Sequence, residues 1–64
     1  MTLIEARNYL NQQIELSSGY SRNAIRMLLS EVLRTHGETA TQELIEAFEL
    51  QQRFEITLEG VMRF

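Results

Sequence analysis

Cysteine, proline and tryptophan are absent from this chain of 64 residues, and the only glycines stand at positions 19, 37 and 60. Without cysteine, no disulfide can hold the fold together. No apolar run approaches the ~18 residues that a membrane-spanning helix needs, and no basic start precedes an apolar stretch as in a secretory signal. We therefore expect a cytoplasmic protein with no membrane partner.

Lysine and aspartate are also missing, so all six cations are arginine and all nine anions are glutamate. The formal net charge of −3 gives no general attraction to nucleic acid or to acidic membranes. Arginine offers a planar fork that suits carboxylates and phosphates, which slightly favours pairing at an interface. Compositional drift of the source genome explains the same bias without any function.

The length indicates a single helical domain over residues 1–64. In so short a chain, the free energy gained by burying apolar surface nearly equals the conformational entropy that folding costs. Small domains usually add disulfides, a metal or a partner to become stable. Because cysteine is absent, we expect association with a second copy or with another protein.

Apolar spacing predicts an all-α fold with three helices, over about residues 3–16, 21–36 and 40–53. The second helix carries the broadest apolar face, formed by Ala24, Ile25, Leu28, Leu29, Val32 and Leu33. Since a face this broad touches two neighbours, we expect this helix to be central.

Capping residues mark the expected helix ends. Residues 2–5 and 39–42 both match the capping box, in which two residues satisfy each other's free amides at a helix start. Ser21 is the expected N-cap of the second helix. Gly19 and Gly37 are expected just past the ends of the first and second helices, where glycine tolerates left-handed backbone.

The apolar C-terminal tail, residues 54–64, fits two structures. As a continuation of the third helix, it completes a heptad seam of Ala40, Leu44, Ala47, Gln51, Phe54, Leu58 and Val61. As an extended segment, residues 54–58 alternate apolar and polar side chains like a strand, and a hairpin return is less favoured. Both alternatives stay open.

The same tail is the strongest candidate for a binding surface. In a helical seam, the polar Gln51 could fix the register, and an extended tail could add a strand to a partner's sheet. The competing interpretation is that the tail folds back and completes the core. The predicted interface residues are Leu50, Gln51, Phe54, Ile56, Leu58, Val61, Met62 and Phe64.

Catalytic and metal-binding patterns are missing from the sequence. The single histidine, His36, is expected to interact with carbonyls at a helix end and to pack its ring, and no serine lies in a nucleophile-elbow motif. Neither metal-ligand spacing nor a phosphate-binding glycine-rich loop is found. We therefore expect a protein that is not an enzyme and that carries no metal and no cofactor.

A turn at Gly37 between two helices has the outline of a helix-turn-helix. The helix that would enter the DNA groove is rich in glutamate, however, which opposes contact with phosphates. A better cationic surface, for a phosphate or for an acidic partner, is the stripe of Arg22, Arg26 and Arg34. Nucleic acid is thus a possible but not a favoured partner.

These observations together predict a non-catalytic protein–protein interaction module, working as a homodimer and acting as adaptor, antagonist or regulator. A helix-turn-helix-like DNA-binding regulator is one alternative. A small subunit or assembly factor of a larger complex is another.

Overall fold

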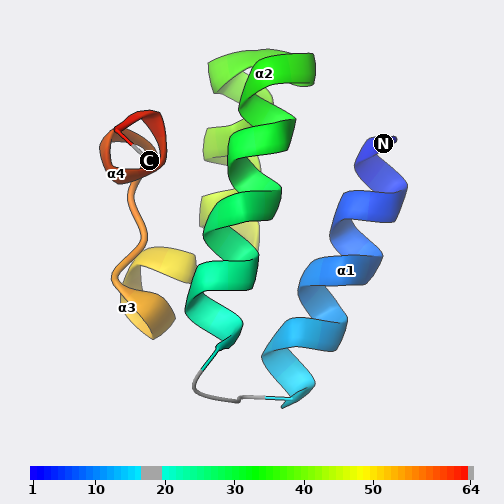
Figure 1. Ribbon diagram of the computed structural model, residues 1–64, viewed down its shortest axis with the longest axis vertical. Helices are drawn as coiled ribbons and strands as arrows, with labels where there is room; N and C mark the ends of the chain where they lie inside the picture. The colour runs from blue at the N-terminus through cyan, green and yellow to red at the C-terminus, as the bar shows by residue number, and fades with distance from the viewer. Residues whose placement is uncertain (17–19, 64) are drawn as a thin grey trace.

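The computed structural model describes residues 1–16 and 20–63. They form a small all-α domain of four helices, α1 (Leu3–Leu16), α2 (Ser21–Ala47), α3 (Leu50–Phe54) and α4 (Leu58–Met62) (Figure 1). No strand occurs in this described part of the chain, so the predicted helical class is confirmed. The predicted bounds of the first helix are also confirmed, whereas the prediction for Gly19 falls outside the described residues.

α2 consists of two helical segments that meet at Gly37, where φ is 91° and ψ is 179°. Glycine adopts this backbone conformation readily, and a residue with a Cβ does so only at a cost. The chain reverses there, and the second half of α2 runs back behind the first (Figure 1). The helix end predicted at Gly37 is therefore confirmed.

α2 is the central element, as its broad apolar face predicts, because α1, α3 and α4 all pack against it. In Figure 1, α1 lies on one side of α2, and α3 and α4 lie on the other. The buried apolar residues are Ala6, Leu10, Ile25, Leu28, Leu29, Val32, Leu44, Ile45, Leu50, Ile56 and Val61.

The first capping box forms as predicted. The Glu5 amide donates to Thr2 Oγ1 at 3.1 Å, and the Thr2 amide donates to Glu5 Oε1 at 2.8 Å. The other two predicted N-terminal caps are wrong.

Ser21 does not cap α2, since Tyr20 occupies the N-cap position. The Ser21 hydroxyl is buried and donates to the Gln13 carbonyl at 3.1 Å, which joins the start of α2 to α1. The capping box at residues 39–42 does not form, because the helix resumes directly after Gly37. Gln42 Nε2 instead donates to Glu46 Oε2 at 3.2 Å.

The prediction of one helix over residues 40–53 is wrong, and so is its continuation as a heptad seam. The helix stops at Ala47, and Glu49 and Glu55 both adopt left-handed backbone, with φ of 53° and 58°. Each such residue costs about 1 kcal/mol. Burying Leu50 and Ile56 in the shared core outweighs that cost, because a straight helix would carry them away from it.

The tail combines the two alternatives that its sequence allows. The backbone after α3 leaves the helical conformation at Glu55 and is extended at Thr57, with φ −120° and ψ 160°. It then re-enters a helix, α4, which Thr57 caps by accepting a hydrogen bond from the Gly60 amide at 3.1 Å. A hairpin is not formed by residues 54–63.

Candidate interaction surfaces

Three of the predicted interface residues, Leu50, Ile56 and Val61, lie in the core of the chain itself. While the tail stays docked, these side chains have no surface to offer to a partner. The remaining members differ in accessibility. Gln51 is exposed, Met62 is 55 % exposed, and Phe54 and Leu58 are half-buried against the core. Phe64 lies outside the described residues.

The three arginines of the predicted stripe make two different kinds of contact. Arg22 Nε donates to the Phe54 carbonyl at 2.8 Å, and Arg26 Nη2 donates to the Gly60 carbonyl at 3.4 Å. Both carbonyls stand near the ends of short helices, where helical partners run out. Arg22 and Arg26 therefore attach the tail to α2, a role that no local sequence signal reveals.

Arg34, the third member of the stripe, forms an ion pair with Glu31 one helical turn away, at 2.6 Å. The hydrogen bond from Arg34 lowers the pKa of the Glu31 carboxyl, and the same bond raises the pKa of Arg34. Because both side chains face solvent, this pair contributes little to stability.

An outward stripe that starts at Tyr20, the N-cap of α2, and continues along α2 carries exposed large side chains. Residues 20, 27 and 34 follow at intervals of seven, which places them on one face of a helix. Tyr20 is 83 % exposed and Met27 is 63 % exposed. At about 100° per residue along the helix, this face lies opposite the buried Ile25 and Val32.

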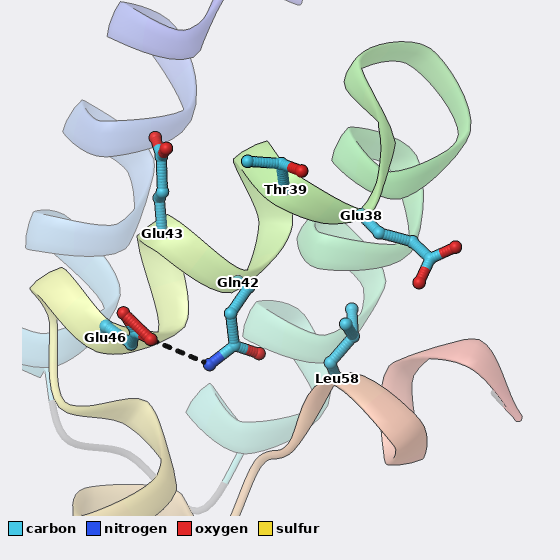
Figure 2. Close-up of a pocket in the computed structure, with 6 residues that line it drawn as sticks. All are labelled: Glu38, Thr39, Gln42, Glu43, Glu46 and Leu58. Atoms are coloured by element: carbon cyan, nitrogen blue, oxygen red, sulfur yellow. Dashed lines mark hydrogen bonds between the residues drawn. The ribbon is translucent and has the colours of Figure 1, made fainter.

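A second surface is an open hollow of about 360 Å³ between the second half of α2 and the start of α4 (Figure 2). Its lining contains one apolar residue, Leu58, and five polar or charged residues, Glu38, Thr39, Gln42, Glu43 and Glu46. In Figure 2, Leu58 stands across from Gln42 and Glu38, while Glu43 extends away from it. No local sequence pattern indicates this site, since only the reversal at Gly37 and the turn at Glu55 bring its two walls together.

His36 lies at the end of the first half of α2, as predicted, but its ring is exposed. Its Nε2 lies 2.9 Å from the Met1 carbonyl oxygen, so the histidine ties the N-terminus to the turn at Gly37. Within residues 1–16 and 20–63, no group of three histidine, cysteine or acidic side chains is arranged to hold a metal ion. None of the helices described is sufficiently long and apolar to traverse a bilayer.

The class that these observations define is a small all-α domain built around one central, reversing helix. Scans against family models, curated proteins and solved structures found no match to this chain.

Proposed function

We propose that this protein is a non-catalytic protein–protein interaction module that works as a homodimer, in the manner of an adaptor, antagonist or regulator. The observation that carries the proposal is the outward stripe of α2, defined by Tyr20, Met27 and Arg34. A tyrosine and a methionine exposed at intervals of seven on one helix face suit packing against another helix.

Two copies of α2 can meet along this stripe in an antiparallel pair around a two-fold axis. With Met27 at the axis, Tyr20 of one copy comes opposite Arg34 of the other, because each lies seven residues from Met27. An arginine over a tyrosine ring gains a cation–π contact, and two methionines pack readily at the centre. The pairing is thus self-complementary along its length.

The proposal is tested by measuring the molar mass in solution over a wide range of protein concentration. We expect the wild type to be a dimer at high concentration and to dissociate on dilution, with a thermal midpoint that rises with concentration. The variant Met27→Glu places two carboxylates at the two-fold axis, so it should remain a monomer. A monomeric wild type with a constant midpoint would contradict the proposal.

The matched control is Ile4→Glu. Ile4 is 73 % exposed and belongs to α1, so it is not part of the outward stripe of α2. This variant introduces the same charge at an exposed apolar position and should leave the dimer intact. If both variants gave monomers, or neither did, the interface would not be the outward stripe.

A further inference from the structure

The hollow between α2 and α4 is lined by the apolar side chain of Leu58 and by the acidic residues Glu38, Glu43 and Glu46. We propose that it is the docking groove for a basic, amphipathic helix of a partner protein, which inserts an apolar side chain beside Leu58 and sets lysine or arginine side chains against Glu38 and Glu46. This inference deepens the proposed function by naming the kind of partner that the module recognises, and it rests on that function.

The apolar residue in the lining of the groove is Leu58. Leu58, at the start of α4, is half-buried against the core and still reaches the hollow. Across from it, Gln42 is held by its hydrogen bond to Glu46, which fixes the amide at the edge of the opening (Figure 2). The hollow of about 360 Å³ is open to solvent and accommodates a few side chains of a partner. It therefore suits a protein surface better than an enclosed small molecule.

The rim lacks a neutralising cation. The ion pairs of the described residues engage Glu31, Glu49 and Glu59, and leave Glu38, Glu43 and Glu46 without one. Residues 37–52 contain four glutamates and no arginine, lysine or histidine. All charged side chains in the second half of α2 are thus acidic. They attract and orient a partner of complementary positive charge.

The partner is expected to be a helix because the groove follows α2 over two turns, from Glu38 to Glu46. A helix laid along this face presents side chains at spacings of three and four residues. One apolar position can then enter the hollow while the basic positions on either side reach the rim. Rim charges are solvated, so they govern specificity and salt dependence more than total affinity.

The test uses the full-length protein and a short synthetic amidated peptide of lysine and leucine, with the leucines on one helical face. Binding is followed by isothermal titration calorimetry and by amide chemical shifts. We expect the largest shift changes along residues 38–46 and around Leu58. A peptide with glutamate in place of lysine, and one with serine in place of leucine, should bind at least about tenfold more weakly.

Two double variants of the protein distinguish the loss of charge at the rim from the same loss of net charge elsewhere. Glu38→Gln with Glu46→Gln removes two rim charges, and Glu15→Gln with Glu55→Gln removes two charges from exposed positions outside the lining. We expect the rim double variant to weaken binding about tenfold, from two exposed ion pairs, and the control to weaken it less than about threefold.

Equal weakening in both double variants, or shift changes that avoid residues 38–46, would overturn the inference. A change of molar mass in the rim double variant alone would mean that a second copy occupies the groove, which also overturns it. Failure of the peptide to bind, with the dimer still disrupted by Met27→Glu, would reject this groove and leave the proposed function standing. A monomeric wild type that binds the peptide in the groove would reject the proposed homodimer and leave the inference about the groove standing.

Discussion

Arg22 donates from its guanidinium Nε to the backbone carbonyl of Phe54 at 2.8 Å, across a sequence separation of 32 residues. This hydrogen bond holds the C-terminal segment against the rest of the domain, because it joins the first turn of α2 to the last residue of α3. Arg26 repeats the contact one turn later, at Gly60. The tail is therefore held by polar contacts at its backbone as well as by the burial of Ile56 and Val61.

Replacing Arg22 by alanine tests this attachment. A charge-assisted hydrogen bond at a partly solvated position is worth about 1 kcal/mol, so Arg22→Ala should lower the thermal midpoint by roughly 4–8 °C. Amide hydrogen exchange should accelerate first in α3 and α4. The control is Arg7→Ala, since the Arg7 side chain is exposed and makes no hydrogen bond or ion pair to the described residues. Equal effects of both variants would contradict the role given to Arg22.

The buried tail residues are expected to behave as core. Ile56→Ala should cost about 2–4 kcal/mol of unfolding free energy, and Ile56→Val about 0.5–1.5 kcal/mol, measured by chemical denaturation. The milder variant keeps the measurement possible if the alanine variant unfolds. Met62→Ala, at an exposed position in the same tail, should cost little. A loss for Ile56→Val that vanished at high protein concentration would indicate that Ile56 acts in an interface instead.

Gly37 should tolerate no side chain, for reasons of backbone conformation alone. A Cβ at this position would meet nothing within 4 Å, so no neighbour would clash with it. The φ of 91° is nevertheless strained for any other residue, and Gly37→Ala should cost about 1–3 kcal/mol. Thr39→Ala, two residues later within the helix, should leave stability unchanged or slightly raised. An unchanged Gly37→Ala would show that the reversal does not depend on glycine.

Glu55 is a position where glycine should stabilise the protein. Its φ of 58° costs a residue with a Cβ about 1 kcal/mol, whereas glycine adopts it freely. Allowing for the greater entropy of glycine in the unfolded chain, Glu55→Gly should raise the unfolding free energy by roughly 0.5 kcal/mol. Gln52→Gly, inside α3, should lower it by about 1 kcal/mol. The expected result is a rise in unfolding free energy for Glu55→Gly and a fall for Gln52→Gly. A fall for both variants would refute the left-handed strain at Glu55.

The capping box makes the start of α1 sensitive to acid. The backbone amide of Thr2, and then its side chain, lower the pKa of the Glu5 carboxyl below its ordinary value. A lowered folded-state pKa stabilises the helix start above the unfolded-state value, and this stabilisation is lost as the pH falls through the folded-state pKa. A carbon-13 NMR titration should show the lowered pKa, and Thr2→Ala should reduce the shift. An unaltered Glu5 titration in that variant would contradict the contribution of the Thr2 side chain.

The sequence by itself determined the features that depend on neighbouring residues. Glu5 lies within reach of the Thr2 amide whatever the rest of the chain does, so the first helix and its cap follow from the pattern. Gly37 permits the reversal because of its own missing Cβ. The wide apolar face of α2 needs two packing neighbours to be buried, so the central position of this helix is predictable from the sequence.

Only the tertiary structure decided where the last third of the chain turns and what it contacts. No residue near Glu49 or Glu55 signals a left-handed backbone, because the gain that outweighs its cost comes from burying Leu50 and Ile56 against distant parts of α2. For the same reason, the sequence pattern places the positive charge of Arg22 on a helix face but does not predict which carbonyl accepts its hydrogen bond. Such contacts join residues far apart in the chain, and their free energy depends on the packed arrangement, which local spacing does not encode.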